Sequence, residues 1–263
     1  MCGRYAVFFD PERFEQAFGV APPAGYETYN AAPSQSLPVV RNAEDEQGSD
    51  GREAATPEWG FVPAWADDGY APNINARAET VRETPSFDDA YRERRCLVPA
   101  SGFYEWRAES GENRPYYFER ESGEPFAMAG IWSERVPETA QAGLDAFAAG
   151  GPSDPEPVET FAVLTRAATG TVADYHHRES VVVAPENYDA WLAGDDPLNA
   201  VLAEPASFDA HRVSAAVNDP SNDAPELTRP VESSGRSRES RPPSPRSGSR
   251  SDRRDDRAGR PGS

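Results

Sequence analysis

The sheet of this protein is predicted most directly by the stretch Cys96-Leu97-Val98-Pro99-Ala100-Ser101-Gly102-Phe103-Tyr104-Glu105-Trp106. Apolar and aromatic residues dominate it, and such residues favour strands over helices. The stretch opens a run of short strands, which we expect at Gly102–Arg107, Pro115–Arg120 and Phe126–Trp132. Short strands joined by brief turns pair as antiparallel neighbours. This part of the chain therefore predicts an antiparallel sheet built from consecutive strands.

The flanking sequence adds short helices and further short strands to this sheet. We expect helices at Pro11–Phe18, Glu79–Arg82, Phe87–Arg94, Glu186–Ala193 and Pro197–Ala203. Further strands are expected at Gly3–Phe9, Thr160–Thr165, Val181–Ala184 and Val213–Val217. Loops are expected at 42–56, which is acidic and contains glycine, and at 135–159, which is rich in Gly, Ala, Pro and Asp.

These elements predict an α+β fold: a single domain over residues 2–231, with a barrel-like sheet of short antiparallel strands flanked by short helices. Residues 232–263 consist mainly of Ser, Arg, Pro and Gly and contain nothing to build a core. We expect this segment to be a disordered tail.

The charge of the chain bears on its partners. All 26 basic residues are arginine, 45 residues are acidic, and the formal net charge is −19. Such an acidic composition without lysine leads to the hypothesis of adaptation to high internal salt. Strong net acidity normally argues against nucleic-acid binding. In molar salt, however, the Debye length falls to about 3 Å and only local contacts count. The charge therefore disfavours a DNA partner only weakly.

Several classes of protein are disfavoured by the sequence. No stretch approaches the ~18 consecutive apolar residues of a membrane span, and no basic region precedes an apolar run at the N-terminus as in a secretory signal. We therefore expect a cytoplasmic protein without a membrane partner. Two cysteines and three histidines are too few for a structural zinc site to be the leading idea. We expect no metal, no cofactor and a monomer.

The N-terminus offers unusual chemistry if Met1 is removed. Cys2 would then carry an α-amine and a thiol on adjacent carbons, with reference pKa values of about 7.7–8.0 and about 8.5. An adjacent amine and thiol condense with an aldehyde, first as an imine and then as a thiazolidine ring. The same group could instead attack an acyl carbon. The alternative is that position 2 merely carries a small residue.

Asn75 and Arg77 flank Ala76, so that in an extended segment their side chains point to the same face. An amide and a guanidinium on one face suit an anion or a carbonyl oxygen. In the alternative interpretation Asn75 holds a turn and Arg77 pairs with Glu79.

Glu105 lies in a strand of aromatic residues. Alternation places Phe103 and Glu105 on one face and Tyr104 and Trp106 on the other. A carboxylate held among rings is desolvated, which raises its pKa toward the range useful for proton transfer. An outward-facing glutamate on an exposed strand is the alternative.

The sequence His176-His177-Arg178 precedes the apolar run Val181-Val182-Val183. One of the two imidazoles could shuttle a proton or form a hydrogen bond with a developing alkoxide. The alternative for a neighbouring histidine pair is a polar loop.

Several motifs in one chain, in this order and spacing, resemble the SOS response-associated peptidase family, abasic-site sensors that cross-link to single-stranded DNA. The motifs are Met1-Cys2-Gly3-Arg4-Tyr5, Asn30-Ala31-Ala32-Pro33, Trp59-Gly60-Phe61-Val62-Pro63-Ala64-Trp65, Asn75-Ala76-Arg77-Ala78-Glu79-Thr80, the stretch Cys96 to Trp106, Thr165, and His176-His177-Arg178. The resemblance covers about Cys2 to Val231.

This resemblance implies a function and a catalytic set. Cys2, exposed when Met1 is removed by autoprocessing or by an aminopeptidase, would form a thiazolidine with the ring-opened sugar of an abasic site. Glu105 would move protons during ring opening and imine formation. His176 would assist ring opening and reversal of the cross-link, and Asn75 would hold Cys2 and the sugar.

The implied partner is single-stranded DNA that contains abasic sites, so the protein would associate with the nucleoid. Arg4 and Arg77 would contact phosphates, and Trp65 would hold bases apart near the junction. Thr165 aligns with an active-site neighbour in the DNA-binding set.

One departure from the family pattern follows the histidine motif. The family usually continues with a hydrophobic or basic residue and then proline, whereas this chain has Glu179-Ser180. The departure places a negative charge near the site, and His177 becomes an alternative to His176 as the working imidazole.

Three functions are consistent with the sequence. The leading hypothesis is an enzyme that cross-links itself to abasic sites, with autopeptidase and lyase-like activity. The second is a cysteine peptidase acting in trans, with Cys2 as nucleophile and His176 as base, which predicts cleavage of peptides. The third is a DNA-binding adaptor in which Cys2 is incidental, which predicts that Cys2→Ser leaves function unchanged.

Overall fold

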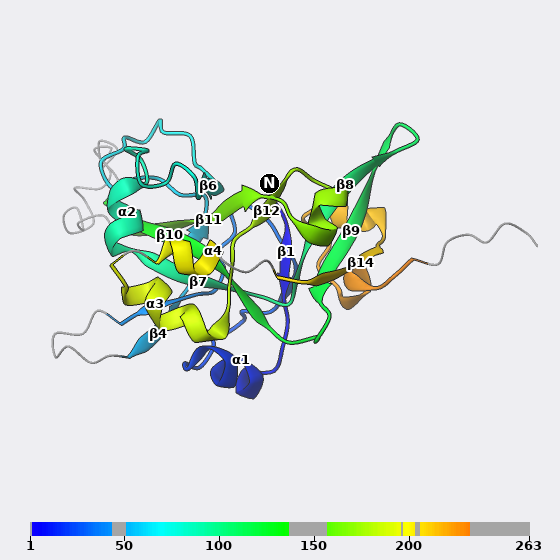
Figure 1. Cartoon of the computed structure of the whole chain (residues 1–263), viewed down its shortest axis with the longest axis horizontal. Helices are drawn as coiled ribbons and strands as arrows, with labels where there is room; N and C mark the ends of the chain where they lie inside the picture. The colour runs from blue at the N-terminus through cyan, green and yellow to red at the C-terminus, as the bar shows by residue number, and fades with distance from the viewer. Residues whose placement is uncertain (1, 44–50, 137–156, 196, 203–205, 232–263) are drawn as a thin grey trace, which may run out of the picture. The chain divides into compact units, whose positions relative to one another are not determined.

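The computed structural model describes residues 2–43, 51–136, 157–195, 197–202 and 206–231 of the chain. Contacts within the chain group Met1–Val231 into one compact unit and Glu232–Ser263 into a second. The predicted disordered tail, and residues 44–50 and 137–156 of the predicted loops, lie outside the described residues; within the loop predicted at 42–56, Arg52–Ala55 forms a strand instead. Within them, the predicted α+β fold with many short antiparallel strands is confirmed (Figure 1).

Two sheets form the first unit. The five-stranded sheet has the order β14-β9-β8-β1-β2, with strands Phe208–Arg212, Glu112–Arg120, Gly102–Glu109, Tyr5–Val7 and Thr28–Ala31. The other sheet follows the path β12-β11-β10-β7-β3-β4, with strands Arg178–Ser180, Val158–Ala167, Phe126–Arg135, Arg95–Ala100, Val39–Asn42 and Arg52–Ala55. Three short strands complete this second sheet: β13 (Val182–Val183), which pairs with β10, and β5 (Glu58–Trp59) and β6 (Asn75–Arg77), which run parallel to β11.

The stretch from Cys96 to Trp106 passes from one sheet to the other. It forms β7 in the second sheet and β8 in the first, with Ser101 at the corner. The backbone N–H of Ser101 donates to the carbonyl of Ala6, and its hydroxyl accepts from the N–H of Phe8, both at 2.8 Å. Strand β1 is therefore fixed where the two sheets meet, and its position determines where Cys2 lies.

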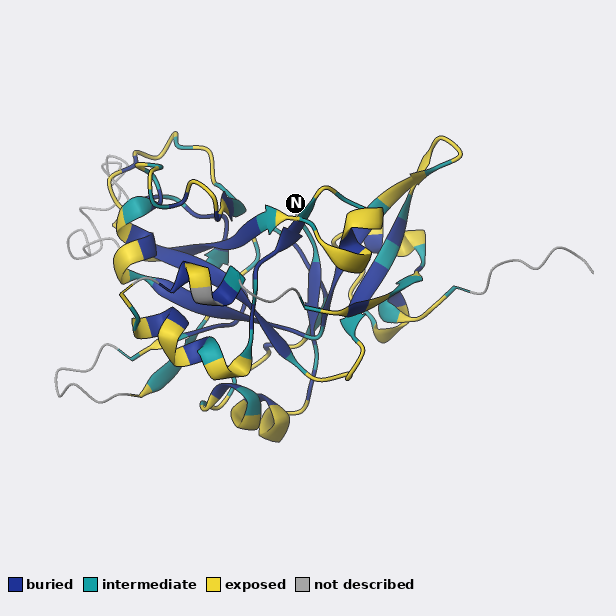
Figure 2. Ribbon diagram, viewed as in Figure 1, coloured by how far each residue is buried: buried dark blue, intermediate teal, exposed yellow. Residues whose placement is uncertain are grey.

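The core follows from the alternation of residues along β8. Phe103 belongs to the main apolar cluster, and Glu105 points to the same side and is buried. Tyr104 belongs to a smaller cluster on the other face, with Trp106 packed against it. The predicted division of this strand into two faces is confirmed. Figure 2 shows that burial is concentrated along the strands, while the helices expose one side.

The described helices are short, and two of them pack against β7 and its neighbouring strands in the second sheet. Helix α1 spans Pro11–Phe18, as predicted, because Asp10 caps its first turn through the N–H of Arg13 and Gly19 ends it with a φ of 76°. The remaining helices are α2 (Asp88–Glu93), α3 (Tyr188–Ala193) and α4 (Leu198–Leu202), and the short 3₁₀ turn η3 (Pro185–Asn187) precedes α3.

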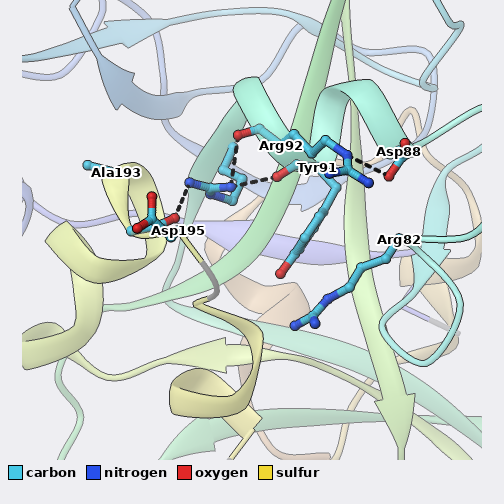
Figure 3. Close-up of a pocket in the computed structure, with 8 residues that line it drawn as sticks. Arg82, Asp88, Tyr91, Arg92, Ala193 and Asp195 are labelled. Atoms are coloured by element: carbon cyan, nitrogen blue, oxygen red, sulfur yellow. Dashed lines mark hydrogen bonds and ion pairs between the residues drawn. The ribbon is translucent and has the colours of Figure 1, made fainter.

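Arg95 joins α2 to α3. Its guanidinium is buried and donates to the carbonyls of Tyr91 and Arg92 at the end of α2, and to those of Trp191 and Gly194 in and after α3. Arg95 is among the residues that line a cavity of about 510 Å³ between α2 and α3, and Figure 3 shows others of them. Because four carbonyls satisfy a buried cation here, this arginine fixes the helices against β7.

Two predicted elements are wrong. Residues Glu79–Arg82 form successive turns rather than a helix, because the N–H of Thr80 bonds the carbonyl of Arg77 three residues earlier and no helical ladder continues. The last strand is β14 at Phe208–Arg212 and not Val213–Val217. The latter forms a 3₁₀ turn (η4, Ala215–Asn218), which brings Val213 and Val217 into the same small cluster.

The close packing around Gly102 at the corner leads to a prediction about stability. A Cβ at this position would overlap the ring of Tyr117 and the carbonyl oxygen of Phe118. We therefore expect Gly102→Ala to lower the free energy of unfolding by about 2 kcal/mol, the usual scale of overpacking. Urea unfolding would measure the change. Gly69→Ala is the control, because its Cβ would meet only Asp67 at an ordinary 3.5 Å. Equal effects of the two substitutions would contradict the close packing at Gly102.

Candidate active site

Cys2 is fully buried, although it is the second residue of the chain. The amide nitrogen of Asn75 donates to the carbonyl oxygen of Cys2 at 2.9 Å. The thiol lies 3.9 Å from the carbonyl oxygen of Arg4, within the range of a weak sulfur hydrogen bond. The predicted pair of Asn75 and Cys2 is thus in direct contact, and β6 supplies the contact.

The end of β11 organises the residues around Cys2. Asn75 on β6 is paired with Val163 of β11, and Thr165 of β11 is paired with Arg77 on one side and with Ser180 of β12 on the other. Paired residues share a face of a sheet, and alternate residues on a strand return to it. Asn75, Thr165 and Ser180 therefore lie on the same face, which is the face that Cys2 covers.

Burial dominates the acidity of the Cys2 thiol. It raises the pKa of the thiol to about 11. The hydroxyl of Ser180, as a hydrogen-bonding group, partly opposes this rise in pKa, whereas the nearby charge of Glu105 adds to it. At neutral pH the thiol is accordingly protonated almost completely.

Glu105 reaches the same site from β8. Its side chain is almost fully buried, and desolvation raises the pKa of the carboxyl group to about 8. The expectation that surrounding rings would desolvate this carboxylate is in line with the structure, and the alternative of an exposed glutamate is wrong. At neutral pH Glu105 holds a proton that it can donate, and it can take a proton back as the reaction proceeds.

His176 stands beside Glu105. Its Nδ1 lies 3.9 Å from the Glu105 carboxylate and 2.9 Å from the carbonyl oxygen of Arg178. Burial lowers the pKa of this imidazole. Because Glu105 is protonated and His176 is neutral near neutral pH, the 3.9 Å contact between them is not an ion pair. His177 is exposed, with its ring centroid 4.3 Å from that of His176.

The guanidinium of Arg178 makes its contacts within the protein. It pairs with Glu79 through two nitrogens at 2.7 and 2.9 Å, and it donates to the carbonyl and the hydroxyl of Thr165. The alternative in which Arg77 pairs with Glu79 is therefore wrong. Arg77 is exposed beside β11.

The carboxylate of Glu179 lies on the face of the sheet opposite to the one that Cys2 covers. Glu179 pairs with Arg166 at 2.7 Å and accepts from the backbone and hydroxyl of Thr169. Glu179 and Arg166 are partners in the sheet register and lie on the face opposite to Thr165 and Ser180. The expected negative charge near the site is therefore compensated on the other side of the sheet.

The predicted DNA contacts differ in their exposure. Trp65 is 63% exposed and lies edge-on against Tyr70. Arg4 is half-buried, and its Nη1 donates to the side-chain oxygen of Asn30 at 2.9 Å and to the carbonyl of Val217 at 3.0 Å. Arg4 thus holds neighbouring segments together, whereas Trp65 faces solvent.

Other site types find little support in the part of the chain that the structure describes. No group of three or more His, Cys, Asp or Glu side chains there could hold a metal ion. No described helix is long and apolar enough to cross a membrane. The cavity between α2 and α3 contains none of the predicted site residues (Figure 3).

The family follows from comparison with known proteins. A model of the family described as SOS response associated peptidase (SRAP) matches residues 1–220. The chain belongs to the SRAP family. It is 32% identical to the abasic site processing protein YoqW of Bacillus subtilis over 242 residues, covering 86% of this chain and 98% of that one.

Relatives of lower sequence identity also match most of this chain. The abasic site processing protein YedK of Escherichia coli is 28% identical, with 88% of this chain and all of that one covered. The HMCES protein of Gallus gallus, also named an abasic site processing protein, is 27% identical, with 88% and 78% covered. A solved structure from Bacteroides thetaiotaomicron shares the fold with a TM-score of 0.69 at 21% identity, covering 88% of this chain and all of that one.

Two contacts of this SRAP site were missed in the sequence. Ser180 was treated only as a departure from the family pattern, although Arg178 and Ser180 are alternate residues and share a face if the segment is a strand. Asn30 was quoted in a motif without a role, and it binds Arg4 and the carbonyls of Val217, Asp219 and Asn222. No local pattern reveals the latter contacts, because they join segments almost 190 residues apart.

The raised pKa of Glu105 predicts a dependence of stability on pH. Below about pH 4.5 both the folded and the unfolded protein hold this proton. Between about pH 4.5 and 8 only the unfolded protein loses it, so the fold loses stability as pH rises, by at most about 5 kcal/mol.

Glu105→Gln removes this ionisation. We expect the variant to equal the wild type below pH 4.5 and to exceed it in stability progressively toward pH 8. Urea unfolding across this range would measure the difference. A difference between the two proteins that does not change with pH would contradict a buried, protonated Glu105.

Proposed function

We propose that this SRAP protein forms a covalent thiazolidine cross-link between Cys2 and abasic sites in single-stranded DNA, and so shields them during the DNA damage response. Met1 is first removed, by autoprocessing or by an aminopeptidase. The observation that carries the proposal is the contact of Asn75 with the carbonyl of Cys2 beside a carboxyl group whose pKa is raised to about 8. The names of the relatives, abasic site processing proteins, support the same substrate.

The residues divide the work in a chemically consistent way. An abasic sugar is a latent aldehyde, and protonation of its ring oxygen by Glu105 opens the ring. The α-amine of Cys2 then attacks the aldehyde carbon, and loss of water gives the imine. His176, neutral and next to Glu105, can accept and return the proton. Asn75 orients Cys2 through its carbonyl, and the thiol closes the ring.

The same groups account for the other two activities in the proposal. Running the steps backwards reopens the thiazolidine and releases the DNA, which gives a slow, lyase-like reversal. Removal of Met1 at this site is an acyl-transfer reaction at the carbonyl just before Cys2, and it would explain the word peptidase in the family description.

A peptidase acting in trans fits the geometry less well. A cysteine nucleophile needs a thiolate, which a neighbouring imidazolium usually stabilises. Here burial raises the pKa of the Cys2 thiol to about 11, and burial lowers the pKa of His176. Both shifts oppose a thiolate–imidazolium pair. An amine that attacks first avoids the difficulty, because the thiol is then needed only after the imine has formed.

Two exposed residues suit single-stranded DNA. Trp65 offers a solvent-facing ring on which a base can stack, and Arg77 offers a free-standing charge to a phosphate. The rest of the surface is acidic, with a net charge of −19 for the chain. High salt, to which we propose the protein is adapted, would screen the repulsion of DNA.

A cross-linking assay tests the proposal. The protein, with the loss of Met1 verified by mass spectrometry, is incubated in molar salt with single-stranded DNA bearing one abasic site. We expect a shifted band that survives heat and denaturing electrophoresis. Cys2→Ala should abolish this band, because its amine forms only a reversible imine. Asn75→Ala should slow its formation by roughly tenfold, the scale of one hydrogen bond to a reacting group.

The contrary result is also informative. If the trimmed protein leaves the DNA unshifted and instead cleaves peptides in a Cys2-dependent manner, cross-linking is wrong and the peptidase hypothesis replaces it. If Cys2→Ala cross-links as well as the wild type, the cysteine is incidental and the adaptor hypothesis gains support.

Substitutions of Arg77 and Arg4 should have different effects on DNA binding and on stability. We expect Arg77→Ala to leave the free energy of unfolding unchanged, to weaken DNA binding, and to reduce by about 1 the slope of log affinity against log salt. Arg4→Ala should destabilise the fold as well, because it removes the donor to the Asn30 side-chain oxygen and one of the two donors to the Val217 carbonyl. Fluorescence anisotropy with undamaged single-stranded DNA, together with urea unfolding, would separate the two. A stability loss in Arg77→Ala, or an unchanged salt slope, would contradict its assignment.

A further inference from the structure

Ser180 occupies a position that the functions above leave unused. It is the last residue of β12 and is paired with Thr165 of β11. Its side chain therefore points to the same face as that of Asn75, which binds the carbonyl of Cys2. Ser180 and Asn75 reach this face from strands on opposite sides of β11, and Cys2 lies over it.

The hydroxyl of Ser180 is buried and completes no hydrogen bond with any described residue, the Cys2 thiol included. A buried hydroxyl without a partner costs stability, so its retention needs a reason. The Cys2 thiol is nevertheless the group that this hydroxyl influences, because the Ser180 side chain, as a hydrogen-bonding group, lowers the pKa of the thiol. Sulfur is a weak and long-range acceptor, and it becomes a strong one only as a thiolate.

We propose that the hydroxyl of Ser180 is the hydrogen-bond donor that stabilises the Cys2 sulfur while this sulfur attacks the imine. This inference rests on the proposed function and adds to it a residue that touches the reacting atom. Alignment follows from the sheet: Asn75 fixes the backbone of Cys2 from β6, and Ser180 meets its side chain from β12.

The step balances with groups already in the site. The protonated imine carries one positive charge, and Glu105, having taken part in ring opening, carries one negative charge. The sulfur forms a bond to the imine carbon, the π pair of the carbon–nitrogen double bond moves to nitrogen, and the thiol proton passes to the Glu105 carboxylate. The products are a neutral thiazolidine and a protonated Glu105. Ser180 donates to sulfur throughout and loses no proton.

The burial of the thiol makes such a donor useful. Desolvation raises the pKa of the Cys2 thiol and Glu105 raises it further, so the sulfur is a poor nucleophile at neutral pH unless something stabilises its developing charge. The described residues offer one other buried hydroxyl coupled to this sulfur, that of Tyr5. The charge of a Cys2 thiolate raises the pKa of Tyr5, and Tyr5 is not a hydrogen-bonding group for the thiol, whereas Ser180 is. Tyr5→Phe is therefore the sharpest comparison for Ser180→Ala.

The first experiment follows the thiol without DNA. Alkylation of Cys2 by iodoacetamide is followed by peptide mass spectrometry, which separates it from Cys96, at a pH well below the pKa of the thiol. Without the Ser180 donor the thiol pKa should rise by about 1, which lowers the thiolate fraction about tenfold. The more basic thiolate is intrinsically more reactive, so the net rate should fall about threefold in Ser180→Ala. A merely structural role predicts an unchanged or faster rate, because alanine leaves more room.

The second experiment separates the two bond-forming steps on abasic DNA. Borohydride converts the imine to a stable amine, so it measures imine formation, whereas survival in denaturing gels without borohydride measures ring closure. In Ser180→Ala we expect borohydride-trapped product at the wild-type rate and heat-stable product about tenfold more slowly. Ser133→Ala, a change at another buried serine of the same sheet, and Tyr5→Phe should match the wild type in both assays.

The outcomes separate the two proposals. If the wild type forms no cross-link, the proposed function fails, and the alkylation rates still decide whether Ser180 donates to the thiol. The Ser180 assignment is overturned if Ser180→Ala alkylates and closes the ring at wild-type rates, or if Tyr5→Phe and not Ser180→Ala slows them. Ser180→Thr, which keeps the hydroxyl, should recover most of the lost rate and rules out a packing effect.

Discussion

The hydrogen bonds of Ser101 to β1 are the constraint on which the site depends. They hold the backbone of Ala6 and Phe8 at the corner where β7 of one sheet continues into β8 of the other. Because β1 is fixed there, the residues before it can only run toward the end of β11, where Asn75 receives the carbonyl of Cys2. The N-terminus, normally the most mobile part of a chain, is thereby placed beside Glu105, which the same corner positions on β8.

Desolvation then determines which chemistry the site favours. It raises the pKa of both Glu105 and the Cys2 thiol and lowers that of His176, so near neutral pH all three groups tend to be uncharged. A site of this kind has a proton to give and a base to take it, but no resting thiolate. It therefore fits the proposed reaction, in which protonation of a sugar ring oxygen exposes an electrophilic carbon, better than attack on an acyl group that needs a charged sulfur.

Local patterns were sufficient for most of the fold and for part of the site. Helix α1 was predicted at its observed bounds with Pro11 near its start, and the structure adds Asp10 and Gly19 as the residues that mark its ends; the two faces of β8 follow from simple alternation. The wrong elements are those in which long-range packing overrode local pattern. Val213 and Val217 look like strand residues, but they pack as neighbours across a 3₁₀ turn in the small cluster.

The contacts of the site depended on pairing that the sequence does not encode locally. Ser180 and Arg77 are both paired with Thr165 of β11. This arrangement depends on the register of β11 with β12 and with β6, and β6 and β12 are about 100 residues apart in the chain. The pairing of Glu79 with Arg178, in place of Arg77, follows from the same register. Alternation could show which side chains share a face of one strand, and only the sheet could show which strands are adjacent.

The register also explains how so acidic a chain leaves room for a phosphate backbone. Each glutamate near the site is neutralised by a different means: Glu79 by Arg178, Glu179 by Arg166 on the far face, and Glu105 by keeping its proton. Arg77 is then left exposed with no acidic neighbour in the register to compete for it. In the molar salt that we propose for this protein, charges are screened beyond a few ångströms, so the local balance around Cys2, and not the net charge of −19, would govern the approach of the proposed DNA partner.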